Sequence, residues 1–110
     1  MELFKKRLSD KEVNQILEKY GNYFKTTVDI ETKLVVVGPK LHADAVDIIK
    51  NEGGNETNIW GGWVNLDERM VETNAVWNIR DSNPSMEILD GDVRIKFINL
   101  VKEYFKNVFG

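Results

Sequence analysis

The chain has 110 residues, of which 42% are hydrophobic and 30% charged, with no cysteine and a formal net charge of -3 at pH 7. Length and composition predict one globular domain over residues 1–110, and the lack of cysteine excludes disulfide scaffolds, thiolate nucleophiles and thiolate metal sites. No apolar stretch has the length of a signal peptide or a transmembrane helix, and the acidic balance predicts no nucleic-acid partner, so we expect a cytoplasmic protein without a membrane partner.

The first part of the chain predicts a helix. Ser9 and Glu12 have the spacing of a capping box, in which each side chain binds the backbone N–H of the other residue. Apolar residues then recur at intervals of three and four, which is typical of one helix face. We therefore expect a helix that begins after Ser9 and ends at Gly21.

A strand pair and a short helix are predicted next. β-Branched and aromatic residues lie on both sides of the polar segment DIETK, which predicts a hairpin with strands at residues 23–30 and 33–37. Pro39 prevents the second strand from continuing. The segment HADAVDIIKNEGG, residues 42–54, then has the apolar spacing of a helix followed by a glycine stop.

A similar order returns in the second half. Apolar runs on both sides of LDER predict a second hairpin, with strands at residues 58–66 and 70–80. Apolar and polar residues alternate in the second of these strands, so Trp77 is expected to point into the core. Asp90 is the predicted N-cap of a final helix, with Asp92 in its first turn.

The predicted order of elements is therefore α-β-β-α-β-β-α. Helices that alternate with strand pairs are typical of an α+β fold. We predict a two-layer sandwich in which the helices cover one face of a four-stranded, mainly antiparallel sheet.

The segment LHADA contains the only histidine of the chain, His42, followed two residues later by Asp44. One interpretation is structural, because both side chains can cap a helix or bind its exposed backbone groups. The other is chemical, because imidazole titrates near neutral pH, so that His42 could act as an acid or base with Asp44 orienting it. The segment lacks a second nearby ligand, so no metal site is predicted.

The segment IWGGWV places two glycines between Trp60 and Trp63 in a predicted strand. Glycine inside a strand indicates a bulge or the close approach of another group. In a regular strand the two tryptophans face opposite sides, so that one can anchor the core while the other meets a ligand or partner chain. Burial of both tryptophans is the structural alternative.

The segment NIRDSNPSMEI, residues 78–88, gathers polar side chains around a proline before the final helix. Its cation, Arg80, could hold a carboxylate or phosphate together with neighbouring hydroxyl and amide groups. The structural alternative is an ion pair of Arg80 with Asp81 or Glu87 that fixes the loop.

These three motifs resemble a family of small prokaryotic proteins described as domains of unknown function. The resemblance covers roughly residues 20–105. It implies no activity and no cofactor, but it makes LHADA and the polar loop candidate partners in one site. The positions that match the motifs of the family are His42, Asp44, Trp60, Asn78, Arg80, Ser85, Met86 and Glu87.

The residues favour a non-catalytic binding or protein-interaction module, which binds another protein chain or itself as a homodimer. The reason is that the chain shows no nucleophile constellation, phosphate loop or metal-ligand spacing. The alternative is a small hydrolase-like enzyme, with His42 as acid or base and Arg80 holding an anionic substrate. A small anion is a further candidate ligand. The candidate ligand-binding residues are His42, Asp44, Trp60, Asn78, Arg80, Ser82, Asn83, Ser85 and Glu87.

Overall fold

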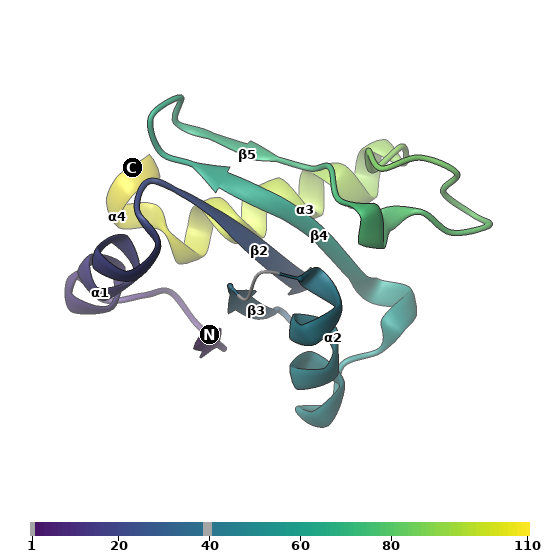
Figure 1. Ribbon diagram of the computed structural model, residues 1–110, viewed down its shortest axis with the longest axis horizontal. Helices are drawn as coiled ribbons and strands as arrows, with labels where there is room; N and C mark the ends of the chain where they lie inside the picture. The colour runs from purple at the N-terminus through teal and green to yellow at the C-terminus, as the bar shows by residue number, and fades with distance from the viewer. Residues whose placement is uncertain (1, 39–40) are drawn as a thin grey trace.

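The computed structural model describes residues 2–38 and 41–110 and contains a five-stranded antiparallel sheet with the order β1-β3-β2-β4-β5 (Figure 1). Pro39, which was predicted to end a strand, lies outside the described residues. The strands are β1 (Glu2–Phe4), β2 (Tyr23–Asp29), β3 (Leu34–Val37), β4 (Ile59–Asn65) and β5 (Met70–Glu72). The helices are α1 (Asp10–Tyr20), α2 (His42–Asn51), α3 (Gly91–Tyr104) and α4 (Lys106–Phe109), with 3-10 helices η1 (Glu56–Asn58) and η2 (Val76–Asn78). The α+β class and the antiparallel sheet are thus confirmed.

The predicted helix ends are confirmed in detail. The Ser9 hydroxyl accepts from the Glu12 N–H at 3.1 Å, and the Glu12 carboxylate accepts from the Ser9 N–H at 2.9 Å. Gly21 ends α1 with a φ of 76°, which suits a residue without a Cβ. The Asp90 carboxylate caps α3 by accepting from the Asp92 N–H at 2.9 Å. Local sequence signals therefore determine these boundaries.

The helices cover both faces of the sheet, so the prediction of two layers with helices on one face is wrong. Val35 and Val37 pack in one core cluster with residues of α1 and α3, whereas Leu34 and Val36 pack in a second cluster with residues of α2. In Figure 1, α2 lies in front of the sheet and α3 passes behind it. A continuous apolar run such as LVVV is typical of a strand that is covered on both faces. The fold has three layers.

The sheet has five strands instead of the predicted four because β1 adds an edge strand. It pairs with β3 from Glu2 opposite Val37 to Phe4 opposite Val35. Three residues are too few to display the alternation from which a strand is recognised. The sequence pattern therefore does not reveal β1.

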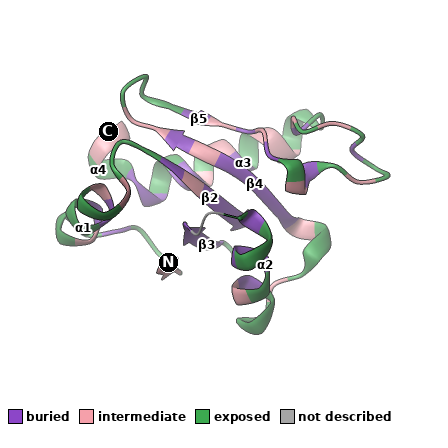
Figure 2. Ribbon diagram, in the orientation of Figure 1, coloured by how far each residue is buried: buried purple, intermediate pink, exposed green. Residues whose placement is uncertain are grey.

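The strand predicted at residues 70–80 ends early, at Glu72. The predicted alternation is confirmed as far as Ala75, and the chain then turns into η2. At the end of η2 the pattern reverses, because Asn78 is fully buried while Ile79 is exposed. Figure 2 shows that buried positions are concentrated in β2, β3 and β4.

Trp77 belongs to η2 and not to a strand, but it is half-buried and packs against the core cluster on the α2 side. Its indole N–H donates to the carbonyl oxygen of Ile59 at 3.0 Å. The indole therefore joins η2 to the first residue of β4.

Candidate functional site

The two glycines of IWGGWV make room for one side chain on each face of the sheet. A Cβ on Gly61 would lie 2.7 Å from Cδ2 of His42, which belongs to α2. A Cβ on Gly62 would lie 2.9 Å from the ring of Phe97, which belongs to α3. The predicted close approach is therefore confirmed, and it occurs twice.

His42 is held against β4 and does not cap its own helix. Its Nε2 lies 3.0 Å from the carbonyl oxygen of Gly62, and the ring is buried. The N-cap of α2 is Leu41, and no described side chain makes a capping hydrogen bond there, so the capping interpretation is wrong. Asp44 is exposed in the first turn, and in the described part of the chain it makes no hydrogen bond with His42.

The environment of His42 favours the neutral ring. Burial lowers the pKa of His42, and the hydrogen bond to the Gly62 carbonyl only partly opposes this effect. The positive charge of Lys25 lowers the pKa further. A neutral imidazole that donates through Nε2 satisfies the Gly62 carbonyl.

This lowered pKa predicts that the protein loses stability in mild acid. When the folded pKa lies below the unfolded value of about 6.5, the unfolded chain binds the proton first as the pH falls. The contribution of His42 is therefore complete above about pH 6.5 and declines as the pH falls from there toward the folded pKa. We expect urea unfolding to show a smaller pH dependence between about pH 7.5 and 5 for His42→Gln than for the wild type. Equal pH dependence of the two proteins would contradict this account.

The two tryptophans of β4 face opposite sides, as predicted. Trp60 is buried in the core cluster that includes α3. Trp63 is half-buried on the α2 face, where Tyr23 stacks on it with a centroid distance of 4.8 Å. The ammonium nitrogen of Lys25 lies 4.6 Å from the Trp63 ring centroid, and the His42 ring meets Trp63 edge-on at 6.1 Å. Trp63 is thus held by three side chains.

A groove of about 840 Å³ lies on the α2 side of the sheet. It is bounded by the start of α2, by β2 and β4, and by the segment 74–86. Its lining is mostly apolar, and a volume of this order is common in sites for small molecules. These apolar side chains line the groove and are exposed to solvent: Tyr23, Leu41, Val76, Ile79 and Met86. The polar lining comes from Lys25, His42, Glu56, Thr57, Asn74 and Arg80.

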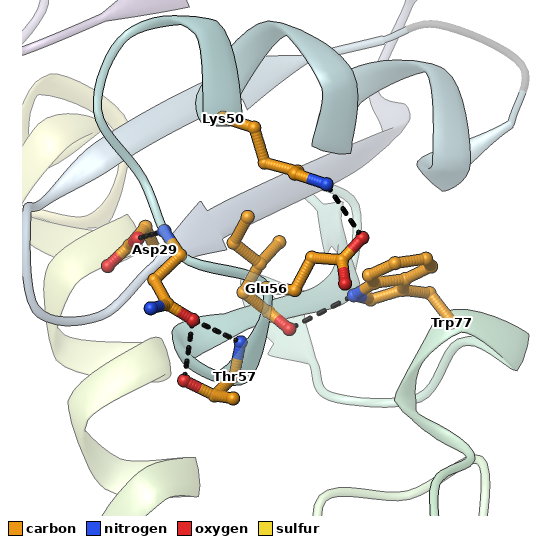
Figure 3. A network of polar contacts seen from close by, with 7 residues as sticks. Asp29, Lys50, Glu56, Thr57 and Trp77 are labelled. Atoms are coloured by element: carbon orange, nitrogen blue, oxygen red, sulfur yellow. Dashed lines mark hydrogen bonds and ion pairs between the residues drawn. The ribbon is translucent and has the colours of Figure 1, made fainter.

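Figure 3 shows the wall of the groove around η1. The Lys50 ammonium pairs with the Glu56 carboxylate at 3.1 Å, and this pair joins α2 to η1. A buried carboxylate of Asp29 accepts from the Asn55 N–H at 2.9 Å. The Asn55 side chain in turn caps η1 by accepting from the Thr57 N–H at 2.9 Å. These contacts hold the groove wall in place.

Arg80 is tied to the backbone of the neighbouring segment. Its Nη2 donates to the Ile59 carbonyl at 2.8 Å and its Nη1 to the Thr57 carbonyl at 3.4 Å. The guanidinium carbon lies 3.8 Å from the Trp60 ring centroid. Burial lowers the pKa of Arg80, and the charge of Glu56 opposes this. Among the described residues neither Asp81 nor Glu87 pairs with Arg80, so the predicted ion pair is not formed.

The side-chain amide of Asn78 makes the two hydrogen bonds to the Gly61 backbone that a neighbouring strand would otherwise make. Its Oδ1 accepts from the Gly61 N–H at 2.8 Å, and its Nδ2 donates to the Gly61 carbonyl at 2.9 Å. Nδ2 also lies 3.1 Å from the Met86 carbonyl oxygen and 3.3 Å from that of Thr73. Asn78 therefore fastens β4 to the loop that follows β5.

The side chain of Asn83 forms hydrogen bonds with several backbone groups of the same loop. Its Nδ2 lies within 3.1 Å of the carbonyl oxygens of Asn78, Ser85 and Glu87. Its Oδ1 accepts from the Leu89 N–H at 2.9 Å. Both buried amides of NIRDSNPSMEI thus satisfy backbone groups that would otherwise be buried without partners.

The other polar residues of this loop have different surroundings. Ser82 is exposed, whereas the Ser85 hydroxyl accepts from the Glu87 N–H at 3.1 Å. The Glu87 carboxylate accepts from the Thr73 hydroxyl. Their positions explain why the segment is so polar: much of it binds its own backbone.

The structure brings His42 and Arg80 to the same groove, together with Trp63 and the motif residue Met86. The other candidate ligand-binding residues, Asp44, Trp60, Asn78, Ser82, Asn83, Ser85 and Glu87, do not line it. Residues that sequence reasoning missed are Tyr23, Lys25, Leu41, Val76 and Ile79. A weak signal was present, because Lys25 places a charge in the middle of a predicted strand, directly after the aromatic pair Tyr23 and Phe24. In the described part of the chain, no group of three or more histidine or acidic side chains could hold a metal.

A family model described as a protein of unknown function (DUF5674) matches residues 2–104. This confirms the resemblance to a family of unknown function and extends it toward the amino terminus. Neither the curated proteins nor the solved structures gave a match. None of the helices in the described part of the chain is long and apolar enough to span a membrane.

Proposed function

Because this chain belongs to the DUF5674 family of proteins of unknown function, we propose a function from its own geometry: it is a non-catalytic binding module whose site is the groove beside α2. The observation that carries the proposal is the concentration of exposed apolar side chains there. Scattered exposed apolar residues are normal, but a contiguous set around a concave surface is typical of a binding site.

The alternative of a hydrolase-like enzyme has less support. It requires Asp44 to orient His42, and those side chains make no hydrogen bond among the described residues. Nε2 of His42 is already bound to Gly62, and Arg80 donates to the Ile59 and Thr57 carbonyls. A general base and an anion clamp need polar atoms that point toward a substrate.

A homodimer is a further proposal for the same surface. Trp60 is buried, so a second chain on this sheet would meet Trp63 and the apolar rim of the groove. Such an interface would bury the rim in both copies, as a two-fold arrangement requires. Sedimentation velocity tests it directly, because a dimer formed through the groove would dissociate when Val76→Asp places a charge on the rim.

The binding proposal is tested with a neutral apolar dye, N-phenyl-1-naphthylamine. We expect the wild type to bind one dye, and Val76→Asp to weaken binding about tenfold or more, because the new carboxylate resists burial against an apolar ligand. Val76 is 71% exposed and its loss leaves the core intact. Fluorescence titration measures both dissociation constants.

Ile95→Asp is the matched control. Ile95 is a similarly exposed apolar residue, 55% accessible, but it lies on α3 and away from the groove. It should leave dye binding unchanged. Equal dye affinity of Val76→Asp and the wild type would contradict the proposed site.

A further inference from the structure

Lys25 supplies the groove with a cation that forms no ion pair with any described side chain. It extends from the central strand β2 and is half-buried beside Trp63. Within residues 2–38 and 41–110, no carboxylate forms an ion pair with it, and its ammonium contacts the Trp63 ring instead. A cation held against an aromatic ring in a mostly apolar surface gains strongly from a bound anion.

The other charged side chains of the groove already form an ion pair or hydrogen bonds within the protein. Glu56, the carboxylate in the lining, pairs with Lys50. Arg80 directs two N–H groups to backbone carbonyls. The lining therefore has an excess of positive charge, and Lys25 is the cation whose donors are free of such contacts within the described residues.

Tyr23, which lines the groove, takes part in a polar bridge to β5. The Tyr23 hydroxyl on β2 donates to the Glu72 carboxylate on β5 at 2.6 Å, and β4 lies between these strands. This hydrogen bond raises the pKa of Tyr23 to about 12, so the phenol stays protonated. It also occupies Glu72, which accepts from Asn65 as well. The Glu72 carboxylate, which belongs to the residue opposite Trp63 on β5, is therefore bound to neutral groups.

We propose that the groove selects a small organic acid, with an apolar aromatic or aliphatic body along the rim of Leu41, Val76 and Ile79 and its carboxylate on Lys25. This inference rests on the proposed function and adds the charge of the ligand to it. Charge complementarity distinguishes this ligand from a neutral apolar molecule. The volume of about 840 Å³ suits a body of this size.

The test compares octanoate with octanamide, which has the same chain but no charge, by isothermal titration calorimetry. We expect wild-type protein to bind octanoate about tenfold more tightly than octanamide, since a charge-assisted contact is stronger than a neutral one. Lys25→Gln should weaken octanoate binding to the level of octanamide and so abolish this preference. Lys96→Gln, on the exposed side of α3, is the matched control and should retain the preference.

Each outcome decides a separate point. Equal affinities of the two ligands, an unchanged preference in Lys25→Gln, or no binding of octanoate would overturn the acid proposal. The neutral dye tests the groove itself without reference to charge, so the proposed function can stand when the acid proposal fails. A dimer formed through the groove that octanoate does not dissociate would instead identify a second copy of the chain as the occupant and would also overturn the acid proposal.

Discussion

Replacing Asn78 with alanine is expected to lower the free energy of unfolding by about 3 kcal/mol. The amide is fully buried and binds both the N–H and the carbonyl of Gly61. The shorter side chain leaves the Gly61 N–H and carbonyl without their partner, whereas the Met86 carbonyl still accepts from the Ala75 N–H at 3.0 Å. Each buried polar group without a partner costs about 1–3 kcal/mol. Urea denaturation measures the change.

Asn22→Ala is the control for this variant. The Asn22 side chain is exposed and donates to the Asp67 carboxylate at 3.1 Å. An exposed contact of this kind contributes little, so the change should stay within about 0.5 kcal/mol. Similar losses for the two variants would mean that Asn78 does not fasten the loop to β4.

Gly62→Ala is the second variant with a large expected effect. A methyl group there would lie 2.1 Å from the Glu72 carbonyl oxygen and 2.9 Å from the Phe97 ring. The backbone of β5 and a buried ring of α3 would both have to move, and overpacking of this kind costs about 3 kcal/mol. Thermal and urea unfolding should both show the loss.

Gly91→Ala is its matched control, because it makes the same chemical change in open space. A Cβ on Gly91 meets no atom within 4 Å, and the residue is the first of α3. Alanine favours the helix, so this variant should be as stable as the wild type or more stable by up to about 1 kcal/mol. Gly62→Ala with wild-type stability would show that β5 does not approach β4 as described.

Local signals in the sequence were sufficient to predict where α1 begins and ends and where α3 begins. The capping box at Ser9, the glycine at 21 and the acid at 90 all act within one helical turn, so they could be recognised without the fold. The run LVVV also carried evidence of two covered faces, but the prediction of two layers did not use it. These features depend on residues that are close in sequence.

The groove could not be predicted in the same way, because its residues come from distant parts of the chain. Lys25 and Val76 line the same groove only after β2, β4 and the loop that follows β5 have come together. The sequence instead directed attention to the polar segment NIRDSNPSMEI. A sequence does not show whether an amide points toward solvent or toward buried backbone, and Asn78 and Asn83 point inward.

The position of the binding site is tested most directly by ¹H–¹⁵N NMR of the tryptophan indoles during titration with octanoate. Trp63 lies in the groove, whereas Trp60 is buried on the other face of β4. We predict that the Trp63 indole signal and the backbone signals of Lys25 and Val76 shift together, while the Trp60 indole signal stays in place. Shifts confined to the hollow formed by Leu66, Arg69 and Phe109, or no shift of the Trp63 signal, would contradict the account.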